Sequence, residues 1–246
     1  MTHRFFIPSQ NGYQVDETID LPQEVAHQLR HVLRVQPGEQ VVVLDDRGWE
    51  YVVQLTQLEK RAGQGVVTAV SRNENEPSLQ LTLFMSLLKR DNFEWVLQKG
   101  TELGVSCFVP VVTSRTVVTA VSPNKFARWQ RIVQEAAEQC RRGRIPTIAP
   151  VTRWDDALAL AAQNDGRFIP WELAEGATIA KNMPPNAASA ALFIGPEGGF
   201  TEDEVAQAQA AGVGPVTLGA RILRAETAAL TAVTLVMAAV GELNKG

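Results

Sequence analysis

Three segments within the first 72 residues are dominated by apolar, β-branched and aromatic residues. They are QVVVLD (40–45), WEYVVQLTQL (49–58) and GVVTAV (65–70). This composition is typical of β-strands. The turn sequence DDRG lies between the first two segments, so we expect these two strands to form a hairpin. The pattern predicts a small unit made mostly of strands.

One helix is expected among these strands, in EVAHQLRHVLR (24–34). Its apolar and basic residues fall on opposite faces of a helix with 3.6 residues per turn. The apolar face contains Val25, Leu29, Val32 and Leu33, and the basic face contains His27, Arg30, His31 and Arg34. His27 and His31 have the i, i+4 spacing of helical metal ligands. No third ligand accompanies them in the sequence, so we predict no metal site.

From residue 79 onward, strand patterns and helix patterns alternate. The expected strands are 79–88, 106–112, 167–171 and 190–195, and the expected helices begin at Asp91, Ser122, Trp154 and Thr201. Such alternation predicts an α/β domain with a largely parallel sheet. The polar stretch SRNENEPS (71–78) precedes this domain and is typical of a linker.

Three of the helix starts carry capping signals. Asp91 stands three residues before Glu94, and Thr201 stands three residues before Glu204, which is the spacing of a capping box. Ser122-Pro123 places a serine at the cap and a proline in the first turn. These signals predict where the three helices begin.

The glycine-rich loop FIGPEGGF (193–200) connects an expected strand with an expected helix. Gly195, Gly198 and Gly199 permit positive φ and allow a ligand to touch the backbone. The loop has neither the lysine of a P-loop nor the spacing GxGxxG. The acidic residues that follow in TEDE also disfavour a phosphate at this helix start. We therefore expect a ligand without phosphate, the alternative being a simple tight turn.

Two further loops follow expected strands. PVTLGARILRAET (215–227) holds Gly219 and the apolar Ile222 and Leu223, flanked by Arg224 and Glu226, before a helix that is apolar almost all round. A helix of that kind is buried on several sides, by the core or by a second subunit. FIPWELAEG (168–176) follows another strand. Ligands of open α/β sheets bind at the carboxyl ends of strands, so the three loops are expected to form one pocket.

The net charge of −4 conceals an uneven distribution. Between residues 85 and 144 there are ten Lys or Arg residues and five Asp or Glu residues. A local basic surface of this kind can bind phosphate groups within an acidic protein. The two cysteines lack CxxC spacing and are expected to fill the core in a reducing cytoplasm. No apolar run reaches the length of a membrane span, and the first residues do not resemble a signal peptide.

Seven segments, spread in order over nearly the whole chain, carry a family resemblance. They are RFFIP, HQLRHVLRVQPGE, LLKRDNFEWVLQKGTELGV, SRTVV, RWQRIVQEAAEQCRRGRIP, GPEGGF with TEDEV, and LGARILRAETAAL. Together they resemble the SPOUT class of RNA methyltransferases, and more closely the bacterial 16S rRNA (uridine-N3)-methyltransferases. The segment KRDNFEW departs from the more lysine-rich form expected in that family, and Arg90 can serve in place of a lysine.

The resemblance implies a fold class and a set of partners. It implies a PUA-like β-barrel that helps to bind RNA at 1–72, a linker at 73–78, and an α/β domain with a deep trefoil knot at 79–246. The C-terminal domain would bind S-adenosylmethionine and form a homodimer. The reaction implied is methylation of N3 of one uridine in 16S rRNA, in the assembled small ribosomal subunit. The protein would be cytoplasmic and would not contact a membrane.

The resemblance also places the cofactor site in the three loops. The implied cofactor-binding residues are Pro170, Trp171, Glu172, Ile194, Gly195, Gly198, Gly199, Leu218, Gly219, Ile222, Leu223 and Arg224. Apolar residues beside a glycine suit a flat ring such as adenine. For Ile222 and Leu223, packing into the core is the alternative.

Three charged residues in these loops are candidates for catalysis. Arg224 is expected to stabilise developing charge or to hold RNA near the methyl group, and Glu226 and Glu197 are candidate proton acceptors. Each has a structural alternative. Arg224 can simply fix its loop, and Glu226 can favour the N-terminus of the last helix.

The candidate RNA-binding residues are basic and come from both halves of the chain. They are Arg4, Arg30, His31, Arg34, Lys89, Arg90, Lys99, Arg115, Arg141, Arg142 and Arg144. The three arginines after Cys140 have an alternative role, since positive charges at a helix C-terminus favour the helix dipole. If these residues contact phosphates, RNA affinity is expected to fall steeply with salt.

Two other functions fit the same residues. One is a SPOUT methyltransferase that modifies transfer RNA or another ribosomal RNA position. The other is an RNA-binding assembly factor that has no enzymatic activity. Intact glycine loops disfavour the assembly factor, which would not need a cofactor.

Overall fold

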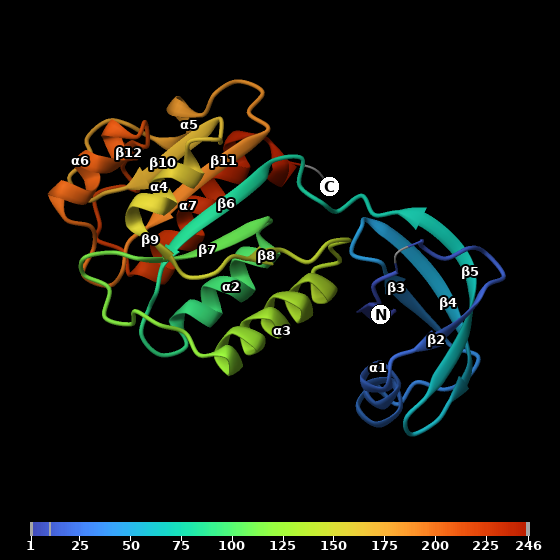
Figure 1. The fold of residues 1–246 in the computed structure, drawn as a ribbon. Helices are drawn as coiled ribbons and strands as arrows, with labels where there is room; N and C mark the ends of the chain where they lie inside the picture. Colours follow the sequence, from blue (N-terminus) through green and yellow to red (C-terminus); the bar gives the residue numbers. More distant parts are fainter. Residues whose placement is uncertain (1, 10, 245–246) are drawn as a thin grey trace. The chain divides into compact units, whose positions relative to one another are not determined.

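The structure is a computed structural model that describes residues 2–9 and 11–244. The chain forms two compact units (Figure 1). The first unit comprises 1–76 and 137–145, and the second comprises 77–136 and 146–246. In the described part of the chain, no helix is both long and apolar enough to cross a membrane.

The first unit is built around a five-stranded sheet. Its strands are β1 (Arg4–Phe6), β2 (Thr18–Leu21), β3 (Gln40–Leu44), β4 (Trp49–Leu58) and β5 (Gly63–Arg72), in the order β1-β3-β4-β5-β2. The pairs are antiparallel except for β1 and β3. The expected hairpin is confirmed, with Leu44 opposite Glu50 on either side of the DDRG turn. Leu29, Tyr51 and Leu55 are among the side chains that fill the core of this unit.

The expected helix at 24–34 is only partly regular. It begins as α1 (Gln23–His27) and continues as a π-helix, η1 (Gln28–Leu33), which ends at Arg34 in the left-handed conformation. Leu29 of the expected apolar face is fully buried, but Val32 does not share that environment, because its side chain is 66% exposed. A π-helix holds more residues in each turn, so the face expected for a 3.6-residue period does not continue through its second half.

The segment 137–145 packs with the strands of the first unit. The amide of Phe6 donates to the carboxylate of Glu138 at 3.0 Å, and the amide of Gly48 donates to the carbonyl of Gly143 at 3.2 Å. The guanidinium of Arg142 forms an ion pair of 2.9 Å with Glu76. These bonds join residues more than 60 positions apart, and the sequence pattern gave no sign of them.

The second unit contains a sheet in which every pair is parallel. Its strands are β6 (Gln80–Ser86), β7 (Cys107–Val112), β8 (Thr147–Ile148), β9 (Thr152–Arg153), β10 (Gly166–Pro170), β11 (Ser189–Ile194) and β12 (Gly214–Val216). The strand order is β12-β10-β11-β6-β7-β8, and β9 also pairs with β7. The expected α/β domain with a largely parallel sheet is confirmed.

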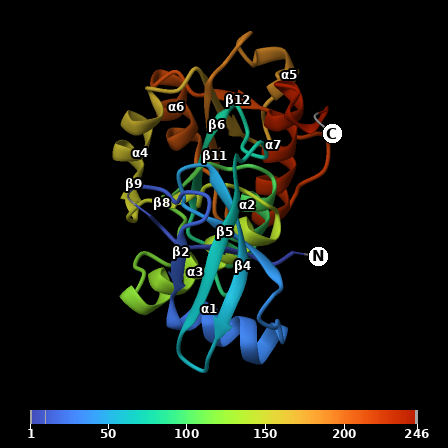
Figure 2. The same cartoon turned by 90° about the vertical axis from the view of Figure 1, so that its right-hand side faces the viewer.

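Helices cover both faces of this sheet. They are α2 (Asn92–Glu102), α3 (Pro123–Gln139), α4 (Trp154–Ala161), α5 (Ile179–Asn182), α6 (Glu202–Ala210) and α7 (Ala225–Ala239), followed by the 3-10 turn η2 (Glu242–Asn244). Figure 2 shows α4 and α6 on one side of the sheet and α2 and α7 on the other. The helix starts at Ser122 and Thr201 are confirmed, since each side-chain oxygen accepts a backbone amide of the first turn.

The capping box expected at Asp91 is wrong. Asp91 makes no side-chain cap, and the carboxylate of Glu94 forms an ion pair of 2.8 Å with Arg128 of α3. Glu94 is buried, and a buried carboxylate needs a charged partner more than an exposed helix end needs a second cap. The pair therefore joins α2 to α3.

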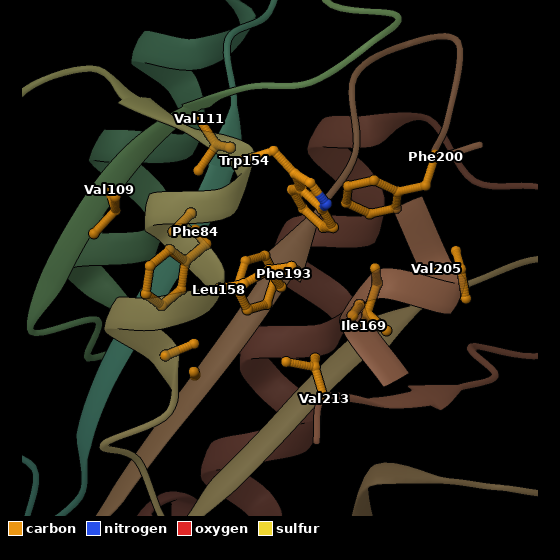
Figure 3. Close-up of a cluster of buried hydrophobic side chains, with 14 residues drawn as sticks. Phe84, Val109, Val111, Trp154, Leu158, Ile169, Phe193, Phe200, Val205 and Val213 are labelled. Atoms are coloured by element: carbon orange, nitrogen blue, oxygen red, sulfur yellow. The ribbon is translucent and has the colours of Figure 1, made fainter. Parts of the chain in front are cut away.

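The core between α4, α6 and the sheet contains a group of aromatic rings (Figure 3). Phe84 of β6 and Phe193 of β11 are stacked, with ring centroids 4.5 Å apart. Trp154 of α4 meets both Phe193 and Phe200, at 5.5 and 5.4 Å. Phe200 is the last residue of the glycine-rich loop, so this packing attaches the loop to the core.

Candidate active site

The loops that follow β10, β11 and β12 meet at one edge of the parallel sheet. β10 lies between β11 and β12, and Pro170 at the end of β10 is in register with Val216 at the end of β12. The three loops surround a cavity of about 580 Å³. All twelve predicted cofactor-binding residues line this cavity, as do Glu197 and Glu226. The structure thus brings together every residue that the sequence placed in the cofactor site or the catalytic site.

Two glycines give the cavity an open backbone wall. Gly199 has φ of +67° and Gly219 has φ of +103°, and a Cβ atom built on either would meet no other atom within 4 Å. A ligand can therefore approach the main chain at both positions. Gly198 is different, since a Cβ there would lie 3.3 Å from the side chain of Arg115.

The helix that follows the glycine-rich loop is held by Glu204. The Thr201 amide donates to one carboxylate oxygen of Glu204 at 2.8 Å, and the Ser114 amide donates to the other at 2.7 Å. The Thr201 hydroxyl accepts in return from the Glu204 amide, which confirms the predicted capping box. Glu204 is only 4% exposed, and the two backbone amides give each of its buried carboxylate oxygens a hydrogen-bond partner. The capping residue therefore also holds the loop after β7.

Three hydrogen bonds from two neighbouring loops hold the glycine-rich loop. The Arg115 guanidinium donates to the carbonyl of Gly198 at 2.7 Å and to that of Phe200 at 3.3 Å. The carboxylate of Glu197 accepts from the amide of Lys89 at 2.9 Å. The loops after β6 and β7 therefore fix the conformation of the loop after β11.

Arg224 and Glu226 stand at the start of α7, at the cavity wall. Arg224 is the N-cap residue, and its extended backbone (φ −64°, ψ 154°) ends the preceding loop. It makes no side-chain cap, and the residue is exposed. Its side chain is therefore available to a ligand.

Apolar side chains complete the loop before α7. Ile222 is 86% exposed and Leu223 is partly buried. Core packing, the alternative considered for Ile222, is wrong. An isoleucine this exposed beside a cavity is suited to contact a ligand or a second protein surface.

The cavity also contains residues that were not predicted. They are Asn92, Pro196, Phe200, Arg221, Ala225 and Ala228. Asn92 is the first residue of α2, and it reaches the cavity because β6 pairs with β11. Sequence patterning does not give the order of strands in a sheet, so it could not have revealed this residue. Arg221 had a signal, because it lies within the loop LGARILR that carries five predicted ligands.

Comparisons with known proteins agree with this geometry. Residues 74–237 match the family model of an RNA methyltransferase domain, and 21–68 match that of an RNA methyltransferase PUA domain. Ribosomal RNA small subunit methyltransferase E of Synechocystis sp. is 37% identical over 229 residues, which cover 91% of this chain and 74% of that protein. The protein of the same name from Bacillus subtilis is 30% identical over 245 residues, or 95% of both chains.

A crystal structure agrees as well. The Neisseria gonorrhoeae ribosomal RNA small subunit methyltransferase E bound to S-adenosyl methionine superimposes with a TM-score of 0.89. It is 34% identical in sequence, and the match covers 99% of this chain and 98% of that one. The chain belongs to the ribosomal RNA small subunit methyltransferase E family.

In this member of the methyltransferase E family, two predicted RNA contacts have another partner. Arg142 is only 4% exposed, and its guanidinium pairs with Glu76. Arg4 is partly buried and forms an ion pair with Glu50. Loss of either arginine would leave its carboxylate partner uncompensated inside the fold. The predicted role in RNA binding is therefore replaced for these two residues by a structural one.

The other predicted RNA contacts of this methyltransferase divide between the two units. In the first unit, Arg30, His31, Arg34, Arg141 and Arg144 are exposed. In the second unit, Lys89 and Arg90 are exposed, Lys99 pairs with Glu102 at 2.7 Å, and Arg115 holds the glycine-rich loop. His27 and His31 lie with ring centroids 4.8 Å apart. Within 2–9 and 11–244, no three His, Cys, Asp or Glu side chains form a metal site.

Proposed function

We propose that this protein transfers a methyl group from S-adenosylmethionine to N3 of one uridine in 16S rRNA, in the assembled small ribosomal subunit. The observation that carries the proposal is the three-loop cavity at the carboxyl edge of the parallel sheet. It gathers the three loops whose sequences resemble the family, together with Arg224 and Glu226. Ligands of open α/β sheets bind at such an edge.

The cavity suits a nucleoside that carries a positive charge and no phosphate. Three carboxylates line it, those of Glu172, Glu197 and Glu226, and they outnumber its two guanidiniums, those of Arg221 and Arg224. No lysine lines it, and the helix that leaves the glycine-rich loop opens with acidic residues, which disfavours a phosphate. The open backbone at Gly199 and Gly219 would accept a ligand edge.

Apolar residues provide the place for the adenine ring. Ile194, Leu218, Ile222 and Leu223 line the same cavity. A flat ring is held well between apolar side chains and backbone in a site of this size. The twelve loop residues are therefore the proposed cofactor site.

The cofactor, when bound, supplies an electrophilic methyl group on a sulfonium. Uracil N3 carries a proton that must leave as the new N–CH₃ bond forms, and the bond from that carbon to sulfur breaks. Arg224 lines the cavity, and we assign to it the stabilisation of the negative charge that develops on the uracil. Glu226, in the first turn of α7, is the proposed proton acceptor.

Glu197 is assigned a different role. Its carboxylate already accepts a hydrogen bond of 2.9 Å from the Lys89 amide, which holds the side chain against the backbone. A group held in this way positions the loop and is less suited to take a proton from the substrate. We assign proton transfer to Glu226 and loop positioning to Glu197.

Residues 1–72 are proposed to form the PUA-like RNA-binding domain, 73–78 the linker and 79–246 the catalytic domain. The trefoil knot within 79–246 remains a prediction from the resemblance. A homodimer through the catalytic domain is proposed because apolar residues of this domain are exposed in the single chain. Ile222 is 86% exposed and Leu235 of α7 is 40% exposed. A second subunit that covers them would complete the burial expected for an apolar helix.

Labelled methyl transfer tests the proposal. Purified protein would be incubated with S-adenosylmethionine that carries a labelled methyl group. Three separate reactions would contain unmodified small subunits, free 16S rRNA or transfer RNA as the substrate. The RNA would then be digested to nucleosides. We expect label in N3-methyluridine from small subunits. Label in another nucleoside or only in transfer RNA would contradict the substrate, and RNA binding without cofactor binding would indicate an assembly factor.

A further inference from the structure

Two guanidinium groups of the first unit converge on one backbone oxygen. Arg72, at the end of β5, donates to the carbonyl of Arg47 at 3.5 Å, and Arg144 donates to the same carbonyl at 3.4 Å. Their positions agree with the space beside Gly48, where a Cβ would lie 3.6 Å from each side chain. Two positive charges from segments 72 residues apart are thus held beside the turn between β3 and β4.

The turn that presents this carbonyl is rigidly built. Asp45 is 2% exposed, and one of its carboxylate oxygens accepts from the amides of Arg47 and Trp49 at 2.8 and 3.0 Å. Gly48 has φ of +91°, which a residue with a side chain rarely adopts. The Arg72 guanidinium stacks over the Trp49 ring at 4.2 Å from its centroid. The arrangement is therefore fixed before any ligand arrives.

The local charge balance leaves the pair positive. Neither Arg72 nor Arg144 forms an ion pair with any carboxylate in the described part of the chain. The opposing charges recorded beside the pair are those of Asp46 and Glu76. The Asp46 carboxylate accepts from the Ile145 amide at 2.7 Å and interacts with Arg144 through space, and the Glu76 carboxylate accepts from the Arg144 amide at 3.1 Å. Glu76 already pairs with Arg142, so the two guanidiniums are not fully neutralised and part of their mutual repulsion remains.

The hydrogen bonds to the carbonyl are also long. Distances of 3.4 and 3.5 Å are at the outer limit for N–H donors. Each guanidinium has five N–H groups, and most of those of Arg72 and Arg144 point to no acceptor that the structure records. An anion with several oxygens would use these donors and remove the repulsion at the same time.

We propose that Arg72 and Arg144 together bind a backbone phosphate of the RNA substrate. The inference rests on the proposed function and adds a specific phosphate site to it, with Arg72 as a contact that the sequence did not suggest. Guanidinium forks match the geometry of phosphate oxygens and hold them through paired hydrogen bonds. The stack on Trp49 orients the Arg72 fork, so little side-chain freedom is lost on binding.

Salt-dependent RNA binding tests the site. The affinity of full-length protein for in vitro transcribed 16S rRNA would be measured between about 50 and 200 mM KCl. We expect the double variant Arg72→Gln with Arg144→Gln to bind several-fold more weakly at the low end. The slope of log affinity against log salt should fall in magnitude by about 1, since one phosphate contact contributes about 0.7 to 0.9. Arg72→Lys with Arg144→Lys keeps both charges and should retain most of the slope.

A matched control removes the same net charge elsewhere. Arg153→Gln with Lys181→Gln changes two exposed residues of the second unit and should leave the slope unchanged. Since loss of the Trp49 stack could disturb the fold, the single variant Arg144→Gln and the melting temperature of each variant complete the set. An unchanged slope in the double variant, or an equal fall in the control, would overturn the phosphate site. A wild-type protein that binds no 16S rRNA would instead overturn the proposed function.

Discussion

The guanidinium of Arg115 donates a hydrogen bond of 2.7 Å to the carbonyl of Gly198. This hydrogen bond joins the loop after β7 to the glycine-rich loop after β11. The sequence placed Arg115 among the RNA contacts, yet its donors are used on the backbone of the proposed cofactor loop. Arg115 is therefore interpreted as a positioning residue for the cofactor.

Replacing Arg115 by methionine is expected to weaken binding of S-adenosylmethionine and to leave RNA affinity unchanged. The loss should be about 1 kcal/mol, or about fivefold, because a charge-assisted hydrogen bond contributes somewhat more when buried and this side chain is partly exposed. Calorimetric titration with the cofactor measures the effect. The cofactor affinity of Arg115→Lys should lie between those of the wild type and the methionine variant. If RNA affinity drops while cofactor affinity stays, Arg115 is an RNA contact after all.

Gly219→Ala is expected to lower cofactor affinity at least about tenfold without a clash in the free protein. The φ of +103° lies beyond the left-handed region that L-residues tolerate at about 1–2 kcal/mol, so alanine would move the loop. Gly199 has φ of +67°, within that region, so Gly199→Ala should lose less cofactor affinity than Gly219→Ala. Titration with the cofactor compares the two variants. Equal effects would show that backbone strain is not the reason.

Arg224→Ala is expected to abolish methyl transfer while cofactor affinity stays nearly intact. Its side chain makes no cap in the structure, so its removal should not melt α7. Arg221→Ala removes the same charge from the same cavity and is the matched control, with at most a modest loss of rate. Single-turnover transfer of label gives both rates. Wild-type turnover in Arg224→Ala would remove it from the mechanism.

Asp165 is expected to stabilise the protein only above acidic pH. Hydrogen bonds from the Ala188 amide, the Ser189 hydroxyl and the Ser189 amide hold the pKa of this carboxylate below its ordinary value of 3.8. A group with a lowered pKa stabilises the fold above that ordinary value and loses its effect as the pH falls through the folded pKa. Asp165→Asn should therefore lower the melting temperature at neutral pH, with a difference from wild type that shrinks below pH 3.8.

Thermal unfolding of both proteins across this range measures the effect. Glu175→Gln, which alters an exposed carboxylate of the same unit, is the matched control for loss of one carboxylate. If the melting temperature of Asp165→Asn stays below that of the wild type by the same amount in acid, the negative charge of Asp165 does not explain the lost stability.

The sequence predicted local structure correctly where the bonded residues are close neighbours in the chain, as at the N-terminal cap of α6. Thr201 and Glu204 lie within one turn, so the atoms that bond are neighbours whatever the rest of the chain does. The same spacing at Asp91 and Glu94 failed, because Arg128, 34 residues away, takes the carboxylate of Glu94. A tertiary partner overrides a local signal when the side chain is buried.

The residues of the candidate site also divide into those that a local pattern predicts and those whose role depends on partners distant in sequence. The three loops were predicted because each carries its own pattern of glycine and apolar residues at the end of a strand. Asn92 was not predicted, because its place in the cavity depends on the pairing of β6 with β11. The roles of Arg115 and Arg142 also depend on partners distant in sequence, Gly198 and Glu76. Charge alone predicted basic residues for RNA and could not separate those that the fold uses.

Calorimetric titration of the wild-type protein with S-adenosylmethionine, S-adenosylhomocysteine and ATP tests most directly whether the three-loop cavity is a site for a phosphate-free nucleoside. The account predicts saturable binding of the first two ligands, a marked loss for both in Gly219→Ala, and no measurable binding of ATP. Absence of binding by S-adenosylmethionine, or ATP binding of similar strength that Gly219→Ala leaves unchanged, would contradict it.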